Sequence, residues 1–344
     1  MSMVAPAPPG TDETAMDFRR PLPEIRWQPR LSPGPGTGSP LPPCCTIDFQ
    51  SHMDLKTLQD TPPWEWPKNA GKMFLAILRD PHADAADRLL AAGLAGDFTV
   101  IDDALAAALL SILGSAAEPQ ELRARAAISL GPALEQADID EFDDPDASPI
   151  SPQTFRAIKQ SLRQLFLDSG VPDLVRRSIL EAAVRAPQDW HTGAIRSAWS
   201  NRDREWKRTA VFGMGHVRGF DQQILEALES SDPGIHYQAV RAAGTWEVEA
   251  AWPHVAALAT SDTNKPLRLA AIEALGTICP LDSVAILANL TDSQDEDIAE
   301  TAGEAMSMAE GMSDDGTGDN SVGDDFDDED DDEEPGSGNH QSIH

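Results

Sequence analysis

Apolar residues recur in short segments between about Asp54 and Gly311, and the segments alternate with turns that contain Asp-Pro, Gly and Asn. Within a segment the apolar residues are three or four positions apart, which places them on one face of a helix. No segment shows a convincing alternation of apolar and polar residues of the kind found in a half-buried strand. The pattern therefore predicts an all-helical domain over residues 53–311.

One ten-residue block recurs along this domain. Its clearest copy is Leu267 to Gly276 (LRLAAIEALG). Good matches are Leu122 to Gly131, Trp206 to Gly215 and Ile235 to Gly244, and weaker ones are Asp87 to Gly96, Val175 to Val184 and Ile298 to Ser307. The blocks end at residues 96, 131, 184, 215, 244, 276 and 307, which are 35, 53, 31, 29, 32 and 31 residues apart. A period near 30 residues is typical of a two-helix repeat.

Each repeat carries signals for the start and the end of its helices. Asp232-Pro233 and Asp80-Pro81 precede blocks, with Lys265-Pro266 as a variant, and such pairs predict a helix start. Glycine at the end of a block predicts a left-handed residue that terminates the helix. A second helix is expected after the block, for example at Gln222 to Leu228 or Pro253 to Ala259. Such pairs must stack to bury their apolar faces, and the polar last block suits a C-terminal cap.

The Asp-Pro start, the Leu/Val-Arg pair, the Ala-Ala centre and the closing Leu-Gly resemble short HEAT-like repeats of the phycobilisome-lyase type. The resemblance covers roughly residues 70–310. It implies an all-α fold, an α-solenoid of about six to seven two-helix repeats that forms a curved right-handed stack. It also implies an extended concave face, used mostly for protein–protein contact. His236 and Ala299 depart from the family's arginine position.

The flanking and inserted segments have a different composition. Residues 1–52 are rich in Pro and Gly, which predicts a disordered extension, and Met53 could be the true start. An acidic insertion spans about residues 135–152. From Ser313 to Glu334 the chain carries 13 Asp/Glu and no Lys or Arg, so residues 312–344 are expected to form a disordered acidic tail.

Charge and apolar runs exclude several function classes. The net charge of −32 makes nucleic acid an improbable general partner, because nucleic-acid-binding proteins carry basic patches. The longest uncharged apolar stretch, Ala104 to Ala117, is too short to cross a bilayer and predicts a buried helix. The N-terminus resembles no secretory signal, and the three cysteines form no C-x-x-C motif. We therefore expect a cytoplasmic protein without membrane contact.

Some HEAT-like proteins are enzymes, so we looked for catalytic patterns. The iron ligands of deoxyhypusine hydroxylases are repeated His-Glu pairs, and no histidine of this chain is followed by Glu. His216 is expected just after a helix end, where an imidazolium would favour the last carbonyls, and His254 at a helix start. The sequence thus predicts no catalytic residue, no metal and no cofactor. A HEAT-fold enzyme resembling the bilin lyases or the DNA-alkylation-repair proteins remains the alternative.

The strongest local contrast is a basic region over residues 153–218, which holds 12 Arg/Lys against six Asp/Glu. Trp206 occupies the first position of its block and is expected in the core. Tryptophan and arginine dominate binding hot spots. The candidate binding surface is therefore Trp190, Arg196, Trp199, Arg202 and Arg204.

These features favour a non-catalytic scaffold or adaptor that binds an unidentified protein partner on the solenoid surface. Two roles are open for the acidic tail beyond simple solubility. It could fold back onto the 153–218 basic region and compete with an anionic partner, or it could itself attract basic proteins.

Overall fold

The computed structural model describes residues 55–139 and 148–314, all within the unit formed by residues 53–344. These residues form helices and short turns and contain no strand, which confirms the all-α prediction. The predictions about residues 1–52, Met53 and the acidic tail beyond residue 314 lie outside the described residues. So does the middle of the insertion.

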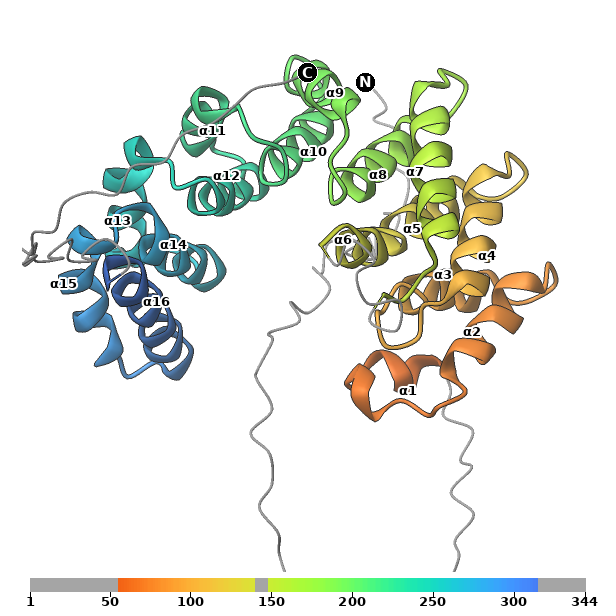
Figure 1. Ribbon diagram of the computed structural model, residues 1–344, viewed down its shortest axis with the longest axis horizontal. Helices are drawn as coiled ribbons and strands as arrows, with labels where there is room; N and C mark the ends of the chain where they lie inside the picture. Colours follow the sequence, from red (N-terminus) through yellow and green to blue (C-terminus); the bar gives the residue numbers. More distant parts are fainter. Residues whose placement is uncertain (1–54, 140–147, 315–344) are drawn as a thin grey trace, which may run out of the picture. The chain divides into compact units, whose positions relative to one another are not determined.

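The helices follow one another with short connections (Figure 1). The first group comprises α1 (Leu55–Gln59), the 3-10 turn η1 (Pro63–Glu65), α2 (Ala70–Arg79), α3 (Ala85–Leu94), α4 (Asp103–Gly114), α5 (Gln120–Ser129), α6 (Gly131–Ile139), α7 (Pro152–Leu167) and α8 (Asp173–Ala183). The second comprises α9 (Asp189–Trp199), α10 (Arg204–Met214), α11 (Asp221–Leu228), α12 (Pro233–Thr245), the 3-10 turn η2 (Glu249–Ala251), α13 (Trp252–Thr260), α14 (Lys265–Ile278), α15 (Pro280–Thr291) and α16 (Glu296–Asp314).

The helices that carry the ten-residue blocks form one continuous layer, which we call the block layer. Its members are α3, α5, α8, α10, α12, α14 and α16, and each packs against the next. Every block helix also packs against the helix before it, in the pairs α2/α3, α4/α5, α7/α8, α9/α10, α11/α12, α13/α14 and α15/α16. The described residues therefore form an α-solenoid of two-helix repeats, as the period predicted.

Helix α6 stands outside this pairing. It lies where the predicted insertion begins, and it packs against α5, α7 and α8. Its Leu134 and Ala137 are fully buried, and after the undescribed residues 140–147 the chain returns with Ile150 buried as well. The long interval between the second and third blocks therefore contains an additional packed helix. The uncharged stretch predicted to be buried forms α4, whose Leu105, Leu109 and Leu113 are buried.

The helix starts agree with the sequence signals in two cases out of three. Asp232 caps α12 and accepts hydrogen bonds from the backbone N–H groups of Gly234 and Ile235 at 2.9 and 3.0 Å. Helix α14 begins at Lys265, with Asn264 as its cap. The expectation for Asp80-Pro81 is wrong, because Asp80 ends α2 and the next helix is capped four residues later by Asp84.

The predicted role of the block glycines is also wrong. Among the described residues only Gly219 and Glu247 have positive φ angles, so the block glycines do not adopt the left-handed conformation. They instead permit neighbouring block helices to approach closely. A Cβ atom added to Gly244 would lie 2.9 Å from the Cβ of Ala274, and one added to Gly276 would lie 2.8 Å from the carbonyl oxygen of Ala305.

The arginine at the second block position has a repeated structural task. It donates a hydrogen bond to a carbonyl near the end of the preceding helix, where helical carbonyls lack partners. The pairs are Arg88 with Leu78 (3.4 Å), Arg123 with Leu113 (2.9 Å), Arg176 with Phe166 (3.0 Å) and Arg268 with Ala259 (3.0 Å). His236, which replaces the arginine in its block, lies against His254 of α13, with 2.9 Å between the two Nε2 atoms.

Candidate binding surface

The two predicted tryptophans of α9 are half-buried in helix packing. The ring of Trp190 lies 5.1 Å from that of Phe166 at the end of α7, and its Nε1 atom is buried without a hydrogen-bond partner. Trp199, at the end of α9, packs against the core and carries the ammonium group of Lys207 5.5 Å above its ring. Trp190 therefore connects α9 to α7, and Trp199 lies beside α10. Each ring exposes only part of its surface.

The three predicted arginines differ in their contacts. Arg196 is exposed, and its guanidinium lies 5.8 Å from the Phe220 ring. Arg202 is exposed in the turn between α9 and α10. Arg204 reaches across to α12, where its Nε lies 3.3 Å from Oδ2 of Asp232. Among the described contacts, none joins any two of the five predicted residues, so they form an extended surface and not a compact cluster.

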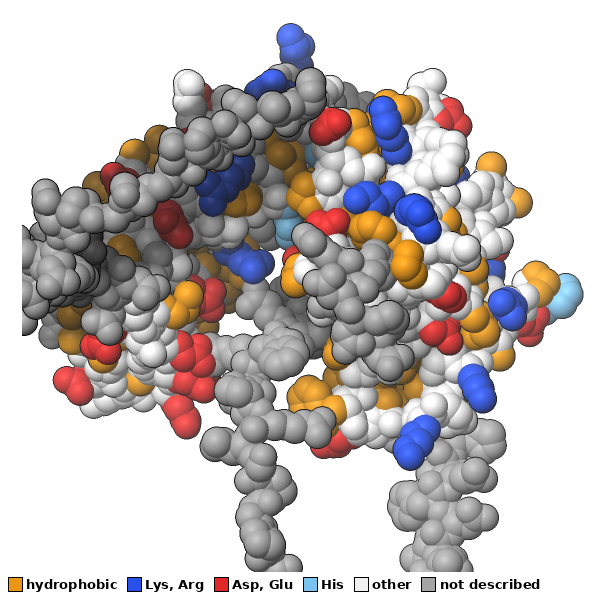
Figure 2. All heavy atoms as spheres, viewed as in Figure 1, with side chains coloured by type: hydrophobic (Ala, Val, Ile, Leu, Met, Phe, Trp, Pro, Cys, Tyr) orange, Lys and Arg blue, Asp and Glu red, His pale blue; other side chains and the backbone are white. Residues whose placement is uncertain are grey.

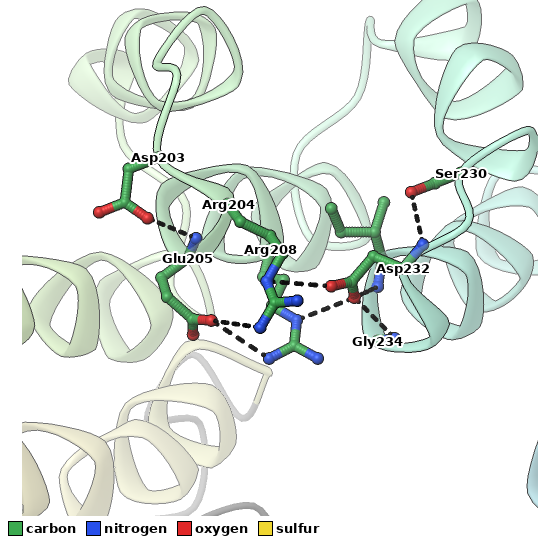
Figure 3. Close-up of polar contacts among 8 residues, drawn as sticks. Asp203, Arg204, Glu205, Arg208, Ser230, Asp232 and Gly234 are labelled. Atoms are coloured by element: carbon green, nitrogen blue, oxygen red, sulfur yellow. Dashed lines mark hydrogen bonds and ion pairs between the residues drawn. The ribbon is translucent and has the colours of Figure 1, made fainter. Parts of the chain in front are cut away.

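Arg204 belongs to a polar network that ties α10 to α12 (Figure 3). Arg208 donates from Nε to Oδ1 of Asp232 at 3.0 Å, the same oxygen that caps α12. Burial opposes ionisation of this carboxyl, but the Ile235 N–H group and Arg208 outweigh it and lower the pKa of Asp232. A buried acid with these partners is a structural element, so Arg204 contributes at least partly to repeat packing.

Three further tryptophans, Trp206, Trp246 and Trp252, also connect helices of neighbouring repeats. Trp206 is only 5% exposed, which confirms its predicted place in the core. Trp246 donates from Nε1 to the carbonyl oxygen of Met214 at 2.6 Å, and Trp252 donates to the Ser283 hydroxyl at 3.1 Å. These contacts link residues that are about one repeat apart in sequence.

A more compact cluster lies on three neighbouring helices of the block layer, α8, α10 and α12. Glu181 of α8, Phe212 of α10 and Arg241 of α12 all occupy the seventh position of their blocks, so they form a row across three neighbouring helices. Residues four positions away extend the row along each helix. We call the resulting surface the central face, defined as Arg177, Glu181, Arg185, Phe212, His216 and Arg241.

Figure 2 shows Lys, Arg and His side chains over the part of the molecule where α10 and α12 lie. A separate group of basic side chains follows α7, which carries Arg156, Lys159 and Arg163 on one side. The basic region of the sequence is thus divided between several surfaces, one of which is the central face.

Arg185 connects the central face to the additional helix. Its guanidinium forms an ion pair with Glu135 of α6 and lies 5.5 Å from the ring of Phe212. The Phe212 ring in turn lies 4.9 Å from that of His216. The aliphatic chain of Arg185 crosses Gly131 of α6, where an added Cβ atom would lie 2.8 Å from the Arg185 Cδ atom. One arginine therefore links α6, α8 and α10.

Burial shifts the pKa values of two groups of the central face in the direction that favours their neutral forms. Burial raises the pKa of Glu181, although Thr209, Arg177 and Arg185 act against it, and its carboxyl accepts a 2.6 Å hydrogen bond from the Thr209 hydroxyl. Burial, followed by the charge of Arg185, lowers the pKa of His216 to about 4. His216 follows the end of α10 as predicted, but its ring is neutral near pH 7, so the expected imidazolium is absent.

Positive charge consequently dominates the central face. Arg177 has no hydrogen bond or ion pair within residues 55–139 and 148–314. The same holds for Arg125 on the neighbouring α5, which is half-buried and whose pKa is lowered by burial. The side chain of Arg125 lies against Gly93 of α3, and Gly93 occupies the seventh position of its block. Within these two ranges the guanidiniums of Arg125 and Arg177 therefore have no partner at hydrogen-bond or ion-pair distance.

The sequence contains a signal for the central face that a selection by tryptophan content does not include. Arg177 and Arg185 are part of the 153–218 charge excess, and alignment of the blocks places Glu181, Phe212 and Arg241 in register. The contact between His236 and His254 was missed as well, because the two histidines lie on different helices. Burial, together with the charge of His254, lowers the pKa of His236.

Two further features bear on the chemistry of the described residues. In residues 55–139 and 148–314, no group of three or more His, Cys, Asp or Glu side chains could hold a metal ion. Within the same ranges, no helix combines the length and apolar character that crossing a membrane requires. The cytoplasmic location stays a prediction.

The family model for HEAT repeats matches residues 221–307, from the start of α11 into α16. The match supports HEAT-like repeats in this part of the chain, and the fold of the described residues is an α-solenoid of two-helix repeats. The phycobilisome-lyase type of these repeats stays a prediction. No curated protein matches the sequence.

Several solved structures are similar to this chain at low identity. The X-ray structure of E. coli YibA is 14% identical, with a TM-score of 0.40, and the match covers 75% of this chain and 89% of that one. Human deoxyhypusine hydroxylase in complex with glycerol is 19% identical, with a TM-score of 0.34 and coverage of 75% and 88%. An engineered protein is 17% identical, with a TM-score of 0.37 and coverage of 60% and 96%. At these values the likeness says nothing about what this chain binds.

Proposed function

We propose that this protein is a non-catalytic scaffold that binds a protein partner on the central face. The observation that carries the proposal is the row of aligned side chains on α8, α10 and α12. At its edge lies the guanidinium of Arg177, which has no hydrogen bond or ion pair within the described residues. Solenoid repeats commonly offer such extended surfaces to partners. Arginines beside a partly exposed aromatic ring, here Phe212, form the kind of contact that dominates protein interfaces.

The charge of the face indicates the chemistry of the partner. The central face carries Arg177, Arg185 and Arg241, and Arg125 lies on the neighbouring α5. The carboxyls near them are Glu135, which is ion-paired with Arg185, Glu181, whose pKa is raised by burial, and Glu205, whose charge also raises the pKa of Glu181. An acidic protein segment would supply carboxylates to the guanidiniums, which bind them well because their geometries match. The partner we expect is therefore acidic where it touches this face.

The alternative function is a HEAT-fold enzyme, and one observation favours it. Glu181 and His216 both interact with Arg185 and both have pKa values shifted by burial, and perturbed pKa values are common at catalytic sites. Glu181, however, is engaged by Thr209 and is only partly accessible. We therefore give the scaffold precedence.

The test is affinity capture from native lysate with the full chain, followed by mass spectrometry. Three double variants, each lacking two positive charges, locate the surface. Arg125→Gln with Arg177→Gln changes the central face together with the neighbouring α5. Arg196→Gln with Arg202→Gln changes the α9 surface predicted from sequence, and Arg156→Gln with Arg163→Gln changes α7.

We expect one protein to be retained by the wild-type chain and by the α7 variant, and to be lost from the central-face variant by tenfold or more. Loss from the α9 variant alone would transfer the function to Arg196 and Arg202. Enrichment of only nucleic acid or a chromophore would contradict the scaffold and support the enzyme class. Far-ultraviolet circular dichroism of each variant checks that helicity is unchanged.

A further inference from the structure

The block layer is electrostatically polarised along its length. The central face on α8, α10 and α12 displays Arg177, Arg185 and Arg241, as described above. The corresponding positions of the next two block helices carry exposed acids: Glu273 on α14, and Glu300 and Glu304 on α16. By formal side-chain charge, these positions are basic on α8 and α12 and acidic on α14 and α16, which favours an acidic chain segment beside the former helices.

The chain itself contains such a segment. Residues 324–334 read DDFDDEDDDEE, so ten of the eleven residues are acidic and the remaining one is Phe326. They follow α16, which ends at Asp314, and α16 is the block helix that packs against α14. The acidic run thus begins ten residues after a helix of the same layer.

This spacing is long enough to reach the central face. Ten extended residues span about 35 Å. Packed helices are about 8–10 Å apart, so α10 lies roughly 30 Å from α16 across the layer. The eleven-residue run, itself about 35 Å long when extended, could then cross α12, α10 and α8. Tethering also gives the segment an effective concentration on the order of millimolar, which favours an intramolecular contact.

We propose that residues 324–334 of this chain bind the central face and occupy it in the absence of a partner. Their carboxylates pair with Arg177 and Arg125, and Phe326 packs beside the exposed part of Phe212. The inference rests on the proposed function in one respect, since it makes the tail a competitor for the surface that an acidic partner would use. Partner binding then requires displacement of the tail.

A photo-crosslinking experiment on the full chain tests the contact. The photoreactive amino acid benzoylphenylalanine replaces Phe326, which preserves an aromatic ring at that position. After irradiation at low salt, mass spectrometry identifies the crosslinked peptides. We expect crosslinks within one chain to peptides from α8, α10 and α12. We also expect their yield to fall at least fivefold in 0.5 M NaCl, because salt screens exposed charges.

Two matched variants make the experiment specific. Arg125→Gln with Arg177→Gln should reduce the crosslink to the central face at least fivefold, whereas Arg156→Gln with Arg163→Gln on α7 should leave it unchanged. A third variant, in which Asn and Gln replace the Asp and Glu of residues 324–334, leaves the described helices untouched and should also abolish the crosslink.

Crosslinks to α7 or α9, crosslinks only between two copies, or the absence of any protein crosslink would each overturn the inference. The result is independent of the affinity capture. If capture fails while the intramolecular crosslink forms, the scaffold is wrong and the tail contact stands. If a partner depends on Arg125 and Arg177 but Phe326 shows no crosslink to the central face, the tail contact is wrong and the scaffold stands.

Discussion

Val184, at the end of α8, faces Gly213 of α10, and its Cγ1 atom lies 3.5 Å from the position that a Cβ on Gly213 would take. At the corresponding contact between α12 and α14 the small residue is on the other side, where Gly244 faces Ala274. The tenth position of one block thus meets the eighth position of the next block, and one of the two is a glycine. Each contact therefore leaves room for close helix packing, with the glycine at the eighth block position in one pair and at the tenth in the other.

This contact predicts that the block glycines are intolerant of a single methyl group. A Cβ added to Gly276 would lie 2.8 Å from the carbonyl oxygen of Ala305 and 3.1 Å from its Cα, and backbone cannot rearrange cheaply. Gly276→Ala should therefore destabilise the fold by about 1–3 kcal/mol. Urea denaturation followed by circular dichroism measures the change.

The matched control for this substitution is Gly193→Ala in α9. Gly193 is exposed, and nothing lies within 4 Å of an added Cβ. Alanine should stabilise this helix by about 0.5–1 kcal/mol, because glycine costs conformational entropy in a helix interior. Equal stability of the two variants would show that the close approach of the block helices is not required.

Glu181→Gln should stabilise the protein at neutral pH. Burial raises the pKa of Glu181, so the folded chain holds the proton more tightly than the unfolded chain. This effect is fully favourable below the usual value near 4.5 and is lost as the pH rises. Glutamine keeps an acceptor for the Thr209 hydroxyl without the buried charge.

Thermal unfolding at several pH values measures this effect. The melting temperature of Glu181→Gln should exceed that of the wild-type chain by a few degrees at pH 7–8, and the two should converge near pH 4. Glu226→Gln on α11 changes an exposed carboxyl and serves as the control. A lower melting temperature for Glu181→Gln at pH 7 would mean that its attraction to Arg177 and Arg185 outweighs its burial.

Mild acid should destabilise the fold through two histidines. Burial, then the charge of Lys159, lowers the pKa of His191 to about 4, and burial, then Arg185, does the same for His216. The stability these groups contribute is fully present above the usual pKa of 6.5. It is lost as the pH falls from 6.5 toward 4, because the unfolded chain binds protons that the folded chain does not.

Denaturation midpoints between pH 7 and pH 5 provide the measurement. The wild-type chain should lose stability over this interval, and His216→Gln should show a shallower loss. His82→Gln removes a histidine that is exposed between α2 and α3, and it should leave the slope unchanged. The same slope in all three proteins would place the protonation elsewhere.

The sequence by itself determined the features that depend on neighbours a few positions away. The apolar period and the ten-residue blocks predicted the all-helical repeat architecture. The Asp232-Pro233 pair predicted a cap, because the capping bonds of Asp232 reach only two and three residues along the chain, to Gly234 and Ile235. The buried position of Trp206 followed from its place in the block. The helix start expected at Asp80-Pro81 was wrong, because Asp80 lies where α2 ends and Asp84 caps the next helix.

Only the tertiary structure decided the features that join residues from different repeats. Glu135 pairs with Arg185 fifty residues away, and His236 meets His254 from another helix. The block glycines were interpreted from local backbone preferences, but their actual task is set by the helix that packs against them. The neutral state of His216 depends on burial and on Arg185 of the preceding repeat. Spatial neighbours, burial and the electrostatic field arise only once the helices stack, and no local pattern records them.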